Sequence, residues 1–546
     1  MEYSRVTDVY AKIEATSKRL EMTDFLVHLL KETPKELIGK IAYLTQGALY
    51  PDFEGIELGM AERMVITAIA AATELEKKEI VDTWKRVGDL GSTVEQLLLA
   101  TSSTPDYVPA KLTPNQHLTV EKVYATFDQI AHTAGKGSVE RKVSLLTGLI
   151  VEATPEEAKY LVRTVTGRLR LGIGDMTFLD ALALAYGGGK ASRKAIEKAY
   201  NMSSDLGLVS ETLAKEGMDG ILRFHVRLGR PIRPMLCERL SSADAILTKL
   251  GGKGSVEYKY DGLRIQAHVS PDGVSLFSRR LENITGQFPD LRRALRNSIQ
   301  AERAIVEGEC VAVDPNTGEL QPFQVVTQRR GRKHGIKEKI AEIPVVLILF
   351  DALFIDGVSL LEESYSRRRE YLERVVEENE ALKITHPRIV TDPKQLDDFM
   401  DEAVEAGCEG LVIKALGADS VYQAGARGFL WIKYKREYKS ELTDTLDLVA
   451  VGAFAGRGRR AGTYGALLMA AYDVESDTFT TVCKLGTGFD DETLAKLPPL
   501  FEEYRVDHVH PRVSSKIEAD YWFVPAKVLE IRGAELTLSP SHTCGP

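Results

Sequence analysis

The chain has 546 residues, of which 44% are hydrophobic and 27% are charged, so wholesale disorder and collagen-like repeats are excluded. At roughly 150 residues per domain, this length predicts three or four domains. The formal net charge of −9 argues against a protein that coats nucleic acid over its whole surface, but it allows local basic faces.

Apolar runs and cysteines indicate the compartment. No apolar run reaches the roughly 18 residues of a membrane span, and the most apolar stretch, 345–355, is interrupted by Asp351. The first residues lack the pattern of a signal peptide. The five cysteines are scattered singly without a CxxC pair, so neither a zinc ribbon nor a disulfide framework is expected. We therefore expect a cytoplasmic monomer without a membrane contact.

Residues 1–230 are predicted to form an all-α domain. Thr154 begins a capping box with proline at the first helical position, and Asp175 precedes another apolar helical pattern. The alanine-rich stretch 64–73 is typical of a buried helix, and the three glycines at 187–189 separate two helices.

The segment 229–234, rich in Gly and Pro, is predicted to be a linker to an α/β domain with antiparallel sheets at 231–436. Helical patterns at 366–379 and 393–405 intervene between short strand-like runs. The runs are 256–260, 264–269, 274–278, 304–313, 345–354, 410–414 and 429–435.

Residues 437–546 are predicted to form a β-barrel of the OB-fold kind. After the polar stretch 436–444, strand-like runs continue over about a hundred residues, a pattern typical of a small barrel. These runs are 446–454, 465–472, 479–484 and 527–530.

The first chemical motif runs from Glu257 to Arg264. Period two places Glu257, Lys259 and Asp261 on one face of a strand. The alternative is a solvated strand face followed by a turn at Gly262. The fixed positions of K-x-D-G-x-R occur by chance in about one chain per hundred.

Two further motifs lie on the next predicted strands. Arg279 follows the strand 274–278, where a basic surface turn is the alternative. Glu307 and Glu309 share a face with Val311 and Val313, and a carboxylate on an apolar face needs a partner unless the face reaches water.

The last three motifs are Phe350 in an apolar strand, the run from Glu409 to Lys414, and the strand that follows Arg427. Phe350 on its own favours a core position. Lys433 and Lys435 share a strand face, an arrangement suited to binding one phosphate. The alternative is an exposed basic edge strand.

Together these motifs resemble, in order and spacing, the covalent nucleotidyltransferases: ATP-dependent DNA ligases, RNA ligases and mRNA capping enzymes. The longer resemblance is to ATP-dependent DNA ligases of the archaeal and eukaryotic replicative type. The stretch 166–174 resembles the signature of their helical DNA-binding domain, and 231–236 resembles the entry to their adenylation domain. The resemblance covers nearly the whole chain and is strongest over 231–435.

The resemblance implies an enzyme that seals nicks in duplex DNA, in replication, repair and recombination, with ATP and Mg²⁺. Lys259 would be the nucleophile that takes AMP. Glu257 would read the adenine, on which Phe350 would stack. Glu309 would hold the ribose, and Glu409, with Glu309, would hold the metal. The resemblance places these cations near the ribose and the phosphates: Arg264, Arg279, Lys414, Arg427, Lys433 and Lys435.

The chemistry of a lysine nucleophile agrees with these roles. A free lysine is almost entirely protonated at pH 7, and neighbouring cations favour loss of its proton. Arg264, Lys433, Lys435 and Mg²⁺ are expected to supply that field and to stabilise charge on the α-phosphate. The negative charge of Asp261 would instead favour the protonated lysine, so we assign Asp261 no activating role.

Two features of these ligases are not found. The chain ends at Pro546, just short of the expected basic motif that orients pyrophosphate, so we expect slow self-adenylation. A sliding clamp is a further partner that the resemblance suggests, but the loop 101–114 contains no clear clamp-binding motif.

Basic residues outside the motifs are candidates for DNA contacts. Arg168 and Arg170 in the helical domain are expected to meet phosphates, with structural salt bridges as the alternative. The stretches 329–334 and 457–460 are expected to follow DNA backbones, with solvated loops as the alternative.

Three rival functions remain. The first rival is a capping guanylyltransferase or an RNA ligase, but the helical domain of about 230 residues favours a duplex DNA substrate. An NAD-dependent ligase would carry a four-cysteine zinc site that is absent from this sequence. A non-catalytic DNA-binding scaffold is disfavoured by the complete set of charged motif residues.

Overall fold

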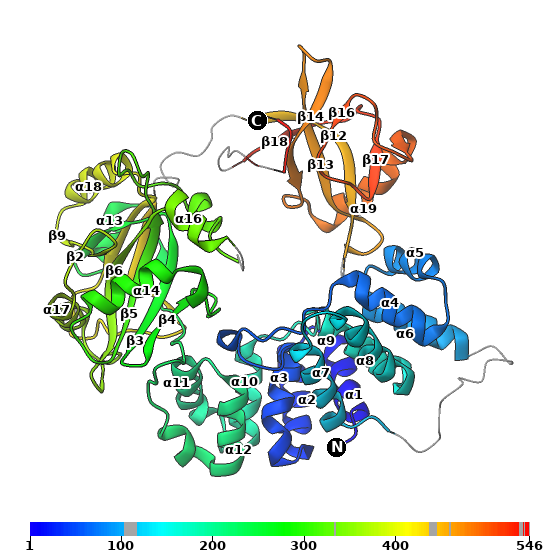
Figure 1. Ribbon diagram of the computed structural model, residues 1–546, viewed down its shortest axis with the longest axis horizontal. Coiled ribbons are helices and arrows are strands. Elements are labelled where there is room, and N and C mark those ends of the chain that lie inside the picture. Colours follow the sequence, from blue (N-terminus) through cyan, green and yellow to red (C-terminus); the bar gives the residue numbers. More distant parts are fainter. Residues whose placement is uncertain are drawn as a thin grey trace. The chain divides into compact units, whose positions relative to one another are not determined.

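The computed structural model describes residues 1–102, 117–331, 335–435, 445–457, 460–533, 539 and 541–544. The chain forms two compact units. Figure 1 labels their helices and strands. The first comprises Met1–Glu14, Leu58–Leu171 and Ser440–Pro546, and the second comprises Ala15–Glu57 and Gly172–Lys439. The helical N-terminal region therefore contributes to both units.

The helices of the first unit confirm two predicted features. The predicted helix 64–73 lies in α4, where Val65, Ala68 and Ile69 are buried. Thr154 caps α9 with a reciprocal pair of hydrogen bonds to Glu157, 3.2 and 2.9 Å long. These helices are α1 (Ser4–Glu14), α4 (Glu62–Thr73), α5 (Lys77–Val87), α6 (Leu90–Ser102), α7 (Val120–His132), α8 (Ser138–Glu152) and α9 (Pro155–Val165).

The second unit holds α2 (Arg19–Glu32), α3 (Ile38–Gln46), α10 (Asp175–Ala185), α11 (Arg193–Ser203) and α12 (Leu206–Leu222). The predicted helix start at Asp175 is confirmed, but its carboxylate does not cap the helix. It accepts hydrogen bonds from Gln46 (3.1 Å) and Tyr200 (2.7 Å) instead. The glycines 187–189 lie between α10 and α11, as predicted.

The α/β region of the second unit contains two sheets, ordered β1-β11-β10-β2-β9 and β4-β3-β5-β6-β7, with β8 paired to β6. Most pairs are antiparallel, as predicted, but β1 with β11 and β6 with β8 are parallel, because long connections return these strands in the same direction. The strands are β1 (Leu236–Arg239), β2 (Gly254–Lys259), β3 (Leu263–Ser270), β4 (Gly273–Ser278), β5 (Ala304–Ala312), β6 (Val345–Ile355), β7 (Val358–Ser359), β8 (Leu382–Ile384), β9 (Arg388–Val390), β10 (Gly410–Lys414) and β11 (Arg427–Lys435).

Each sheet buries one face under helices. Leu295 of α14 and Leu372 of α17 pack on the six-stranded sheet, and Phe399 of α18 packs on the five-stranded sheet. A third apolar cluster joins the sheets and includes Leu353 of β6 and Trp431 of β11. The helices are α13 (Ala243–Lys249), α14 (Pro289–Ser298), α15 (Phe323–Thr327), α16 (Ile336–Glu342), α17 (Tyr365–Val375) and α18 (Pro393–Glu405).

The predicted linker 229–234 connects α12 to β1 and is packed against the α/β region. Gly229 donates its backbone N–H to Nδ1 of His268 (2.9 Å), and Ile232 donates to Gln266 (2.7 Å). The side chain of Ile232 is fully buried. The segment packs against β3, and Ile232 belongs to the apolar cluster between the sheets.

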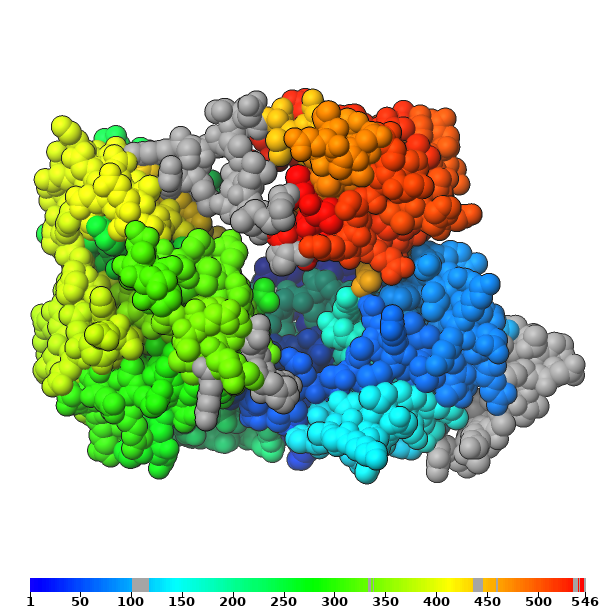
Figure 2. Space-filling view, turned by 45° about the horizontal axis from the view of Figure 1, so that its top comes forward, coloured from blue at the N-terminus to red at the C-terminus, as the bar shows by residue number. Residues whose placement is uncertain are grey.

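The C-terminal region, coloured orange to red in Figure 2, is rich in strands. Its strands form one sheet ordered β15-β17-β12-β13-β14-β16, with β18 paired to β12. Apolar clusters lie on both faces, with Met469 on one and Leu468 on the other, so both faces are covered. A barrel is consistent with this sheet, and the OB-fold stays a prediction. The elements are β12 (Leu446–Ala455), β13 (Tyr464–Asp473), β14 (Thr478–Leu485), α19 (Asp491–Phe501), β15 (Arg505–Val506), β16 (Val513–Ser514), β17 (Tyr521–Phe523) and β18 (Val528–Ile531).

No helix within the described residues is both long and apolar enough to cross a membrane.

Candidate active site

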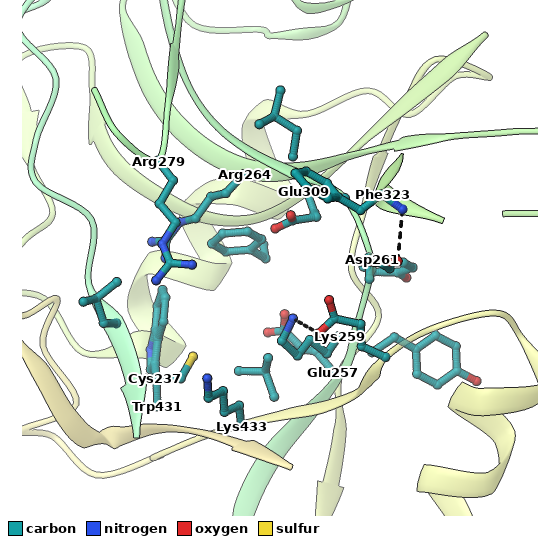
Figure 3. Close-up of a pocket in the computed structure, with 18 of the residues that line it drawn as sticks. Cys237, Glu257, Lys259, Asp261, Arg264, Arg279, Glu309, Phe323, Trp431 and Lys433 are labelled. Carbon is teal, nitrogen blue, oxygen red and sulfur yellow. Dashed lines mark hydrogen bonds and ion pairs between the residues drawn. The ribbon is translucent and has the colours of Figure 1, made fainter. Parts of the chain in front are cut away.

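A cavity of about 530 Å³ opens between the two sheets of the α/β region (Figure 3). Every site residue predicted from the sequence lines it. They are Glu257, Lys259, Arg264, Arg279, Glu309, Phe350, Glu409, Lys414, Arg427, Lys433 and Lys435. Strands far apart in the sequence therefore converge on one concave surface, as expected of a ligand site.

Lys259 ends β2 and is tied to Glu409, which directly precedes β10. The backbone N–H of Glu409 donates to the carbonyl oxygen of Lys259 (2.9 Å). Nζ of Lys259 lies 2.5 Å from the Glu409 carboxylate, and Nζ of Lys435 lies 2.8 Å from the same carboxylate. Burial alone would raise the pKa of Glu409, but the charge of Lys259 and the hydrogen bonds from both lysines lower it to about 2.

Glu257 lies on β2 and is buried in the cavity wall. Its Oε1 accepts a hydrogen bond from the hydroxyl of Tyr365 (2.5 Å) and lies 2.8 Å from Nζ of Lys414. Nζ of Lys414 also donates to the carbonyl oxygen of Phe350 (3.1 Å). The side chain of Lys414 is only 2% exposed, so its charge is balanced by Glu257 before any ligand enters.

Arg264 lines the cavity with a mostly buried side chain, and its charge is balanced within the protein. It donates to Glu307 and to the carbonyl oxygen of Met235, both at 2.7 Å. The expectation that a carboxylate on this face of β5 needs a partner is confirmed for Glu307. The guanidinium of Arg264 lies 5.4 Å from the ring centre of Phe350 and 5.6 Å from that of Trp431.

Glu309 lies two residues further along β5, beside two other carboxylates. Burial raises its pKa to about 7, the cations Lys259 and Arg264 oppose this, and the charges of Glu409 and Asp261 add to it. Burial also raises the pKa of Asp261, and its hydrogen bond with Glu409 acts in the same direction. Asp261 accepts a hydrogen bond from the backbone of Phe323 (3.0 Å; Figure 3).

The metal prediction rests on these carboxylates. In the part of the chain that the structure describes, no group of three or more metal-type side chains is arranged around one point. Glu309 and Glu409 are the two carboxylates predicted to hold the metal, and one or two carboxylates together with substrate phosphates are a donor set that suits Mg²⁺.

Cations line the other side of the cavity. Figure 3 shows Arg279 and Lys433 entering it from different walls. Burial and the charges of Lys435 and Lys259 lower the pKa of Lys433. As predicted, Lys433 and Lys435 lie on the same side of β11, where both line the cavity. Such a concentration of positive charge attracts phosphate groups.

The chain matches the protein families described as "DNA ligase N terminus" (residues 2–183), "ATP dependent DNA ligase domain" (234–435) and "ATP dependent DNA ligase C terminal region" (460–542). It is 52% identical to DNA ligase 2 of Thermofilum pendens, over 100% of this chain and 90% of that protein. The chain belongs to the ATP-dependent DNA ligase family.

Another relative and a solved structure are also similar to this chain. The chain is 49% identical to the probable DNA ligase of Aquifex aeolicus, over 100% of this chain and 91% of that protein. The solved structure Pmar-Lig_Pre has a TM-score of 0.54 at 15% identity, covers 91% of each chain and supports the fold. The activity of this DNA ligase is ATP-dependent sealing of nicks.

Several residues that line the cavity of this ligase were not predicted. Trp431 lies within a predicted strand, and its alternation with Lys433 does not distinguish a core residue from a ligand contact. Cys237 and Thr385 also line the cavity, and neither stands in a recognisable motif. Tyr365 does not line the cavity itself but contacts Glu257, and its place after the N-cap Ser364 of α17 signals a helix start and not this contact.

The structure describes only part of the two basic stretches, 329–334 and 457–460, that were predicted to follow DNA backbones. Arg329 is 2% exposed and forms an ion pair with Asp290, so the prediction is wrong for this residue. Arg330 lines the cavity, and residues 332–334 and 458–459 lie outside the described residues. Arg460 donates to the carbonyl oxygen of Gly486 (2.8 Å).

Arg168 and Arg170 each lie near a carboxylate in the first unit. Arg168 is 3.1 Å from Glu62, and its side chain is 45% exposed. Arg170 is 3.6 Å from Asp89 and has a left-handed backbone with φ of 60°. The salt bridges named as the alternative therefore exist, and the exposed pair of Arg168 leaves that side chain able to meet solvent or a phosphate.

Proposed function

We propose that Lys259 performs the first step of ligation. Its amine attacks the α-phosphorus of ATP, an N–P bond forms, the bond to pyrophosphate breaks, and the proton of the amine is lost. AMP then passes to the 5′-phosphate of a nick, and the 3′-hydroxyl displaces AMP as the strands join. The observation that carries this proposal is the position of Lys259 among carboxylates and cations in the cavity.

The nucleotide would lie against the wall formed by Glu257 and Phe350. We assign the adenine to Glu257, the face of the base to Phe350 and the ribose to Glu309. Stacking on an aromatic ring is worth roughly 1–3 kcal/mol per base. Arg264 would hold Phe350 from below, because its own charge is already balanced by Glu307.

The phosphates would lie against the cations of the opposite wall. We assign them to Arg279, Arg427, Lys433 and Lys435, all of which line the cavity. Lys414 would contribute through Glu257, since the two are already paired. These fixed charges would stabilise the charge that develops on the α-phosphate.

Glu309 and Glu409 would hold Mg²⁺. Burial raises the pKa of Glu309, the negative charge of Glu409 adds to this effect, and a bound cation would offset that repulsion. Bound Mg²⁺ supplies Lewis-acid stabilisation of the phosphates. The residues of the chain would orient the α-phosphorus towards Nζ of Lys259, and Glu409 would give up its pairing with that nitrogen.

Nicked duplex DNA would meet three domains, helical at 1–230, adenylating at 231–436 and OB-fold at 437–546. The family supports the DNA substrate. We propose that the protein acts as a cytoplasmic monomer. A sliding clamp remains a prediction, because the loop 101–114 lies largely outside the described residues.

A nucleotide screen tests this proposal. The protein is incubated with ATP or GTP labelled at the α-phosphate and is then supplied with a nicked duplex. We expect covalent label from ATP alone, followed by transfer of the label to DNA and sealing. Label from GTP, or label that never leaves the protein, would contradict the proposal.

A further inference from the structure

Tyr365 contacts the residue proposed to read the base, although 108 positions separate the two in the sequence. The hydroxyl of Tyr365 donates to Oε1 of Glu257 (2.5 Å), and both side chains are buried. Burial raises the pKa of Tyr365, so its hydroxyl keeps the proton that it donates. A hydrogen bond to a charged acceptor is among the stronger ones in a protein.

The position of Tyr365 is itself firmly fixed. It is the first residue of α17, and its backbone N–H donates to Oγ of Ser420 (3.0 Å). Three residues on, Arg368 forms a fully buried ion pair with Asp351, the residue that follows Phe350 on β6. The hydroxyl is therefore anchored to the strand that carries the proposed stacking ring.

Tyr365 and Lys414 both engage the same oxygen of Glu257. Nζ of Lys414 lies 2.8 Å from Oε1, and neither contact uses Oε2. Two donors on one oxygen hold the plane of the carboxylate in place. An ionised carboxylate only accepts hydrogen bonds.

We propose that Tyr365 is a positioning residue for base selection, fixing Glu257 so that Oε2 accepts from the 6-amino group of adenine. This inference rests on the proposed adenine site. A purine with a 6-oxo group would place an acceptor against the acceptor Oε2 and leave both unsatisfied. Such a mismatch in a buried polar site is heavily penalised.

The test compares self-adenylation of the full chain with ATP and with inosine triphosphate, which carries oxygen in place of the 6-amino group. We expect Tyr365→Phe to raise KM for ATP roughly ten-fold with little change in kcat, because one hydrogen bond to a charged group is lost. The parameters for inosine triphosphate should not change, so discrimination should fall by the same factor.

Tyr160→Phe is the matched control. The hydroxyl of Tyr160 also donates to a carboxylate, that of Glu14 (3.0 Å), but both residues belong to the first unit. This variant should keep the discrimination of the wild type. A purely structural role of Tyr365 would instead lower the rates with both nucleotides equally, and that result would overturn the proposal.

Glu257→Gln supplies a second variant. It should lose discrimination by itself, and adding Tyr365→Phe should cause no further loss, because the hydroxyl acts through Glu257. Independent, additive losses would overturn the inference. Failure of the wild type to form AMP on Lys259 would defeat the proposed function as well. Normal Lys259–AMP with unchanged discrimination in Tyr365→Phe would defeat this inference alone.

Discussion

Nζ of Lys259 and the carboxylate of Glu409 lie 2.5 Å apart, and the ammonium of Lys435 lies 2.8 Å from the same carboxylate. The proposed nucleophile is thus held in an ion pair before a nucleotide enters. Glu409 has two cationic partners, so it can release Lys259 and remain paired with Lys435. In the proposed mechanism, metal binding and release of the nucleophile would be linked through Glu409, because that carboxylate is paired with Lys259.

We expect Glu409→Gln to weaken the apparent affinity for Mg²⁺ in self-adenylation by at least roughly ten-fold. The amide keeps the size of the side chain but removes one of the two carboxylates proposed to hold the metal. The rate is measured across a Mg²⁺ series, with Glu370→Gln, an exposed change on α17, as control. An unchanged Mg²⁺ dependence would remove Glu409 from the metal site.

Asp351→Asn should destabilise the α/β region by about 3–5 kcal/mol, because it leaves the charge of Arg368 buried without its partner. Both side chains of this pair are 0% exposed. The neighbouring pair of Arg367 and Glu370 is exposed, so Arg367→Ala should cost less than about 1 kcal/mol. Calorimetric unfolding of both variants makes the comparison, and similar losses would contradict it.

His268 should make stability depend on pH. Burial lowers its pKa to about 3, against an ordinary value near 6.5. The unfolded chain therefore binds a proton between these values when the folded chain does not, so stability is full above pH 6.5 and falls towards pH 3. At pH 5 the free energy of unfolding is expected to be about 2 kcal/mol lower than at neutral pH.

This pH dependence is measured by unfolding the wild type and His268→Asn between pH 7 and pH 4, roughly spanning the window given by the two pKa values. Asparagine retains an acceptor for the N–H of Gly229 but does not titrate. The variant should have a flatter profile. Parallel profiles would show that His268 is not the group responsible.

Arg168→Gln should weaken binding to a nicked duplex and lower the slope of log affinity against log salt by about 1. The side chain is 45% exposed, and its pair with Glu62 is a weak surface contact that a phosphate can replace. Arg367→Gln is an exposed control on α17. An unchanged slope would assign this arginine a structural role only.

Local sequence patterns predicted much of the fold and the composition of the cavity wall. The helix predicted at 393–405 is observed as Pro393–Glu405, because Asp392 caps it and proline occupies its first position. Spaced motifs predicted the lining of the cavity, since residues in a strand motif point to one face with period two.

Long-range partners could not be predicted in the same way. The contact of Tyr365 with Glu257 and the pairing of Arg264 with Glu307 depend on how separate strands and helices pack. No local pattern encodes which buried carboxylate meets which donor. The burial of Arg329 is a further case, since a run of arginines resembles a solvated loop until Asp290 is placed beside it.

The central claim is that AMP becomes attached to Lys259, and peptide mapping after reaction with ATP tests it most directly. Lys259→Arg keeps the positive charge, but its guanidinium stays protonated and cannot attack phosphorus. We predict AMP on the peptide that contains Lys259 in the wild type and no adenylation of Lys259→Arg. AMP on another lysine, or undiminished adenylation of Lys259→Arg, would contradict the account.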